Sequence, residues 1–113
     1  MRGLLVRWII NGIGLIMTAN IIKGIEVEGI LAALAAAAVL GLVNAIIRPI
    51  VLILTLPVNL LTLGLFTLII NGLMLSLTAA VVEGFAVRGF LSAIVGALLL
   101  SIISGILSAL VKD

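Results

Sequence analysis

Four long apolar segments make up most of the chain and are almost free of charged residues. They span residues 4–22, 30–47, 65–82 and 90–111. About 20 apolar residues are enough to cross the hydrocarbon core of a bilayer, and a backbone inside that core must satisfy its own hydrogen bonds, which favours helices. The hydrophobic fraction of 65% also exceeds the roughly 45–50% of soluble domains. The sequence therefore predicts one all-α domain, residues 1–113, that forms an integral membrane four-helix bundle.

The second half of the chain repeats the first half at an offset of 60 residues. Between positions 9–48 and 69–108, fifteen of forty residues are identical, whereas this biased composition would give about five identities by chance. The connections 23–29 and 83–89 are related in the same way, and the apolar centre of each predicts a short extended piece between glycines. We therefore predict two repeated transmembrane hairpins, residues 4–48 and 65–111.

The linker between the hairpins, residues 49–64, is apolar but contains two prolines. Pro49 and Pro57 each lack a backbone donor and interrupt a helix. We predict a short linker helix that lies in the membrane interface or re-enters it. The alternative is that the second apolar helix continues past a kink at Pro49.

The few charged residues predict an orientation in the membrane. The connections 23–29 and 83–89 hold three carboxylates and two cations, whereas the opposite ends hold Arg2, Arg7, Arg48 and Lys112 against Asp113. Because positively charged ends stay in the cytoplasm, both termini and the linker are expected on the cytoplasmic side. We predict a multi-pass protein of the bacterial inner (cytoplasmic) membrane.

Small residues recur at every fourth position in the second and fourth segments. Such ridges let membrane helices approach closely, so we predict that they are helix-packing surfaces and that at least one joins two chains into a homo-oligomer. The first ridge is the better candidate for contact inside one chain, and the second for the exposed contact. The ridges are Ala33, Ala37, Gly41, Ala45 and Ala93, Ala97, Ser101, Gly105.

The first and third segments share a polar seam of two asparagines and two threonines. Asn11 and Thr18 correspond to Asn71 and Thr78 at the offset of 60. One interpretation is a pore lining. The other, which we favour, is that Asn11 and Asn71 hydrogen-bond to each other and fix the bundle, because polar contacts between membrane helices are common.

Three further polar residues lie near the predicted inner interface. Arg7, Asn44 and Arg48 are candidates for contact with lipid phosphate or for lining a cytoplasmic vestibule. The simpler interpretation is that the arginines extend to the interface and set the orientation. Trp8 has the character of an interfacial anchor.

The composition argues against an enzyme. Cysteine and histidine are absent, and the sequence contains no nucleophile beside a base, no glycine run for phosphate and no buried acid pair. We therefore expect no cofactor, no metal and no soluble substrate. We also expect no nucleic-acid partner, because no basic patch with interleaved aromatics is present. The expected partner is the lipid bilayer.

Several segments together resemble one family of membrane proteins. They are residues 42–50 (LVNAIIRPI), 55–57 (TLP), 61–64 (LTLG), 70–72 (ING) and the glycine-flanked connections. These segments resemble the phage holin family of superfamily IV, small four-helix bacterial membrane proteins of the YvlD type. Lys23 and Glu83 stand where that family often has proline.

The resemblance implies one of two functions. The first is a self-associating, non-enzymatic membrane protein with a structural or envelope-stress role. The second is a holin-like oligomeric pore, or a small-solute channel or transporter.

Overall fold

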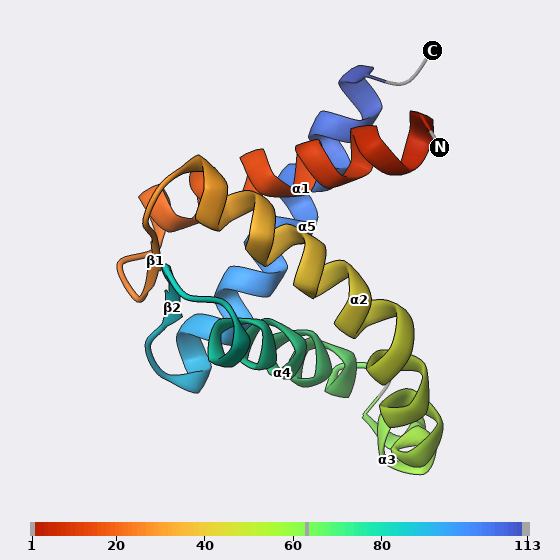
Figure 1. Ribbon diagram of the computed structural model, residues 1–113. Coiled ribbons are helices and arrows are strands. Elements are labelled where there is room, and N and C mark those ends of the chain that lie inside the picture. The colour runs from red at the N-terminus through yellow and green to blue at the C-terminus, as the bar shows by residue number, and fades with distance from the viewer. Residues whose placement is uncertain (1, 63, 112–113) are drawn as a thin grey trace.

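The computed structural model describes residues 2–62 and 64–111 and contains five helices and two strands in that part of the chain (Figure 1). The elements are α1 (Arg2–Ile21), β1 (Ile25–Val27), α2 (Ile30–Leu54), α3 (Leu56–Leu61), α4 (Phe66–Val81), β2 (Phe85–Val87) and α5 (Phe90–Val111). The predicted helical segments are confirmed to within a few residues, except at the end of the second.

Three of the helices are long and apolar enough to cross a membrane: Gly3–Ile21 within α1, α2, and α5. Helix α4 has 16 residues, or about 24 Å at 1.5 Å per residue, which is shorter than a hydrocarbon core of about 30 Å. It begins just after a turn at Gly64, which has a φ of +87°. The amide of Gly64 donates to the carbonyl of Asn59 at 2.8 Å and closes that turn.

Helix α2 does not end at Pro49, as the favoured interpretation of the linker assumed. It continues to Leu54, so the alternative is correct and the linker helix is reduced to α3. A proline inside an apolar helix removes a single backbone hydrogen bond, which membrane helices tolerate when neighbouring segments hold the chain in place. Thr55 caps the C-terminal end of α2, and its hydroxyl donates to the carbonyl of Val51 at 2.7 Å. Pro57 lies in the first turn of α3, where its missing donor has little effect.

The four long helices are arranged in a ring. Helices α1 and α4 run toward one end of the bundle, and α2 and α5 run back from it (Figure 1). Around the ring, α1 contacts α2, α2 contacts α4, α4 contacts α5, and α5 contacts α1. Helices α1 and α4 face each other across the ring without close backbone contact in the described residues, and so do α2 and α5.

A short two-stranded ribbon closes one end of this ring. Strands β1 and β2 are antiparallel, and Glu26 pairs with Ala86 at their centre. The predicted extended pieces are therefore confirmed, although their pairing was not foreseen. Each strand turns one large side chain inward, Ile25 in β1 and Phe85 in β2, and these are 1% and 3% exposed. The ion pair between Arg88 and Glu26 (2.7 Å) is largely exposed and contributes little to stability.

The hydrophobic core lies between this ribbon and the middle of the helices. It contains Leu15, Met74, Leu75 and the inward side chains of the ribbon. The indole N–H of Trp8 donates to the carbonyl of Leu34 at 2.8 Å and joins α1 to α2.

Candidate functional site: a polar cavity between the helices

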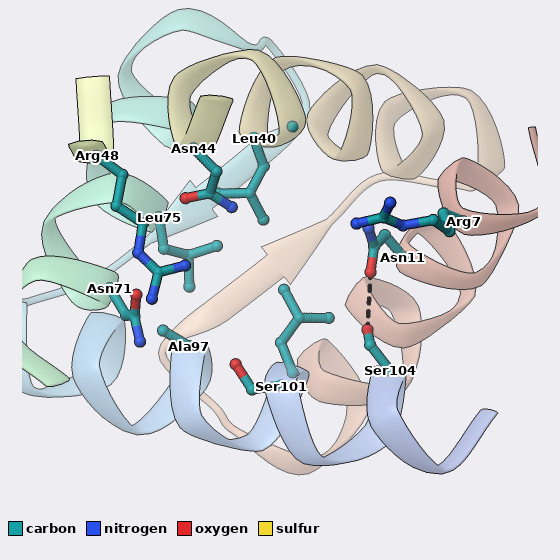
Figure 2. Close-up of a pocket in the computed structure, with 12 residues that line it drawn as sticks. Arg7, Asn11, Leu40, Asn44, Arg48, Asn71, Leu75, Ala97, Ser101 and Ser104 are labelled. Carbon is teal, nitrogen blue, oxygen red and sulfur yellow. Dashed lines mark hydrogen bonds between the residues drawn. The ribbon is translucent and has the colours of Figure 1, made fainter. Parts of the chain in front are cut away.

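A cavity of about 350 Å³ lies between the four long helices (Figure 2). Its lining combines two guanidinium groups, three amides and two hydroxyls with a smaller apolar part. The lining residues are Arg7, Asn11, Leu40, Gly41, Asn44, Arg48, Asn71, Leu75, Ala97, Leu100, Ser101 and Ser104. All four long helices therefore contribute to it.

The cavity has an apolar floor on the side of the ribbon. Leu40, Leu75, Ala97 and Leu100 line it and also belong to the buried core that continues toward the ribbon. On the other side the lining is polar and open, because Arg7 is exposed and Arg48 is half-buried. The cavity is thus a recess with one open side, and the core separates it from the ribbon.

The charge of the cavity is positive. Arg7 and Arg48 supply two guanidinium groups, and no carboxylate is among the lining residues. The carboxylates in the described part of the chain, Glu26, Glu28 and Glu83, all lie in the connections at the ribbon end. In Figure 2 the two arginines enter the cavity from opposite sides, Arg7 from α1 and Arg48 from α2.

The predicted hydrogen bond between Asn11 and Asn71 is not formed, and the prediction is wrong in this respect. The Ser104 hydroxyl in α5 instead donates to Oδ1 of Asn11 at 2.9 Å. Asn11 and Asn71 come from α1 and α4, which lie across the ring, so the amides face each other from opposite sides of the cavity (Figure 2). Neither Asn71 nor Asn44 makes a side-chain hydrogen bond with a residue that the structure describes.

The two threonines of the predicted seam do not line the cavity. Thr18 and Thr78 are fully buried and lie nearer the ribbon than the lining residues of their helices, Thr18 about two turns beyond Asn11 and Thr78 about one turn beyond Leu75. The Thr78 hydroxyl donates to the carbonyl of Met74 at 2.9 Å, whereas Oγ1 of Thr18 has no partner among the described residues. The predicted seam is therefore divided, with its asparagines in the cavity and its threonines in the core.

The two predicted ridges of small residues change environment along their length, and both do so in the same way. In each ridge the half nearer the ribbon is buried, the third position lines the cavity and the last position is exposed. The expected difference between an internal first ridge and an exposed second ridge is therefore wrong. The buried positions are Ala33, Ala37, Ala93 and Ala97, of which Ala97 also lines the cavity. Gly41 and Ser101 are exposed positions that line it, and Ala45 and Gly105 are exposed outside it.

The three residues assigned to the inner interface, Arg7, Asn44 and Arg48, all line the cavity. Sequence reasoning missed Ser104, which bonds Asn11. A signal for it was present, because Ser104 is the counterpart of Asn44 at the offset of 60 residues. The described lining thus holds two cations, three amides and two hydroxyls.

Comparison with known proteins gives a family and one curated relative. The model of a family described as "Mycobacterial 4 TMS phage holin, superfamily IV" matches residues 2–106. The uncharacterized membrane protein YvlD of Bacillus subtilis (strain 168) is 37% identical over 65 residues, which cover 54% of this chain and 55% of that protein. The chain thus spans about half the length of this relative. No solved structure matches the chain.

Proposed function

Because the chain belongs to the superfamily IV phage holin family of membrane proteins, we propose that it is a non-enzymatic integral membrane protein that self-associates and has a structural or envelope-stress role. The observation that favours this proposal over a pore formed by one chain is the apolar floor of the cavity. Leu40, Leu75 and Leu100 are at most 8% exposed and separate the polar recess from the ribbon end. Within residues 2–62 and 64–111, the recess of a single chain is therefore closed by apolar side chains on its way to the ribbon end.

We also propose that the two hairpins are copies of one unit related by a pseudo-twofold axis. The pairing of the ribbon supports this. Ile25 pairs with Val87, and the equivalent residues at the offset of 60, Phe85 and Val27, pair with each other, as a twofold axis through the ribbon requires. The burial pattern of residues 31–40 is also the same, position by position, as that of residues 91–100.

The proposed orientation places the termini and α3 in the cytoplasm and the ribbon outside. Its support is the excess of cations at the end of the bundle that lies away from the ribbon. In intact cells, Glu26→Cys and Ala86→Cys should both react with a membrane-impermeant thiol reagent, since these positions pair in the ribbon. If both cysteines react only after the membrane is permeabilised, the ribbon faces the cytoplasm and the proposed orientation is reversed. If only one of them reacts, the two connections do not lie on the same side of the membrane.

Self-association is proposed to use the exposed ends of the small-residue ridges. A Cβ added at Gly105 would meet no atom within 4 Å, and Gly105 is exposed, so Gly105→Leu is suited to test the outer surface. Ala45→Leu is the matched change on the other ridge. We expect at least one of the two to lower the oligomer mass measured by light scattering in detergent. An unchanged mass in both variants would place the contact elsewhere.

An oligomeric pore is the second candidate, and the polar cavity favours it. A release assay with dye-loaded liposomes separates the two functions. The non-conducting protein that we propose releases no dye, with or without Asn71→Leu. Release by the native chain that disappears on Asn71→Leu would instead establish a pore lined by the cavity.

A further inference from the structure

The Arg48 side chain has an unmet hydrogen-bonding requirement inside the cavity. Its Nε atom is buried and has no partner among the described residues. A guanidinium carries five N–H donors and cannot accept a hydrogen bond, and a buried donor on a charged group that stays unpaired is strongly unfavourable. No carboxylate lines the cavity, and no acceptor of the described residues bonds Nε, so this donor is open to an acceptor from outside the chain.

The neighbouring side chains offer further donors toward the same space. Arg7 brings a second guanidinium from the opposite side (Figure 2). Asn11 accepts a hydrogen bond from the Ser104 hydroxyl through Oδ1, and its amide nitrogen carries two N–H donors. Asn44 and Asn71 add two more amides. A lining with two cations and an excess of donors is complementary to an oxyanion, and the planar fork of arginine matches phosphate in particular.

The depth of the two arginines agrees with a phosphate at the membrane surface. Arg48 lies eighteen residues after Ile30, the first residue of α2, which is about 27 Å along the helix axis. Arg7 is five residues from the start of α1, or about 8 Å. In a hydrocarbon core of about 30 Å, Arg48 lies near the boundary with the lipid phosphates, and the long side chain of Arg7 can extend to the same boundary.

We propose that this cavity binds a phosphate oxyanion, held between Arg48 and Arg7 and oriented by the asparagine amides. Its volume of about 350 Å³ is within the range of about 300–1,000 Å³ for small-molecule sites. The oxyanion comes from the headgroup of an anionic lipid or from phosphate in solution. The binding site goes beyond the proposed function and does not depend on whether the chains associate or conduct.

The test measures thermal unfolding of the purified protein in a neutral detergent, followed by the fluorescence of Trp8. One arm adds inorganic phosphate against chloride at equal ionic strength, and the other adds phosphatidylglycerol against phosphatidylcholine. At least one of the two phosphate probes is expected to raise the melting temperature. Arg48→Gln should weaken the apparent affinity about tenfold or more, as expected for loss of charge-assisted hydrogen bonds.

Arg88→Gln is the matched control, because it removes the same charge from the exposed ribbon end and should leave the affinity unchanged. Arg7→Gln is the second cavity variant, and because Arg7 is exposed, it keeps the test valid if Arg48→Gln does not fold. Protection by inorganic phosphate identifies a soluble oxyanion, and protection by phosphatidylglycerol alone identifies the lipid. The proposal is overturned if neither probe protects, or if Arg88→Gln weakens protection as much as the cavity variants do.

Discussion

Phe85→Ala is expected to lower the free energy of unfolding by about 3–5 kcal/mol, the usual range for truncation of a buried phenylalanine. Phe85 lies in β2, is 3% exposed and belongs to the hydrophobic core. Phe85 lies in the connection between α4 and α5, so its ring leaves the core when the ribbon unfolds. Its truncation also leaves a cavity in the core under the ribbon.

Phe90→Ala is the matched control, because the same atoms are removed from a side chain that is 46% exposed at the start of α5. Its loss should stay below about 1 kcal/mol, as for surface substitutions. Reversible unfolding in detergent, followed by circular dichroism, measures both variants. Equal losses of unfolding free energy in the two variants would contradict the burial of Phe85 in the core under the ribbon.

Gly72→Ala is expected to destabilise the protein by about 1–3 kcal/mol, the range for overpacking a close contact. A Cβ at Gly72 would lie 3.0 Å from the backbone nitrogen of Ile94, 3.1 Å from its Cα and 2.8 Å from its Cγ1. Two of these atoms are backbone, so α4 and α5 must move apart to admit the methyl group.

The equivalent position in the first hairpin provides the control. At Gly12 an added Cβ would come within 3.0 Å only of Cδ2 of Leu34, the flexible end of a side chain, and the nearest backbone atoms are 3.8 Å away. Helix propensity favours alanine over glycine by about 1 kcal/mol, so Gly12→Ala should be close to neutral. The same unfolding measurement compares the two, and equal destabilisation would contradict the closer approach of α4 to α5.

The helices could be predicted from the sequence because their cause is local. A run of apolar residues in lipid has few alternatives to a helix, and the observed bounds of α5 are the predicted ones, residues 90–111. The continuation of α2 through Pro49 could not be predicted, since the outcome depends on how neighbouring segments hold the chain after the proline. The pairing of Glu26 with Ala86 joins residues sixty positions apart and has no local signal.

The candidate site was predicted only in parts. Asn11, Asn71, Asn44, Arg7 and Arg48 were all identified, but as a seam and a separate interfacial group. The offset of 60 residues shows which positions are equivalent but not how the helices are ordered around the ring. In the observed order, equivalent helices lie across from each other. Asn11 and Asn71 therefore face each other over a cavity, and Ser104 from the adjacent α5 becomes the partner of Asn11.

The ring of helices is closed by the chain at one junction and by side chains at another. Helices α2 and α4 are connected through α3, and the Asn59 amide donates to the Thr67 hydroxyl at 3.1 Å and ties α3 to α4. No short segment connects α1 with α5, whose contact includes the Asn11–Ser104 hydrogen bond and the packing of Gly14 near Leu100. The contact between α1 and α5 therefore depends on side-chain packing and this hydrogen bond, whereas the contact between α2 and α4 is also held by the short chain segment that joins them.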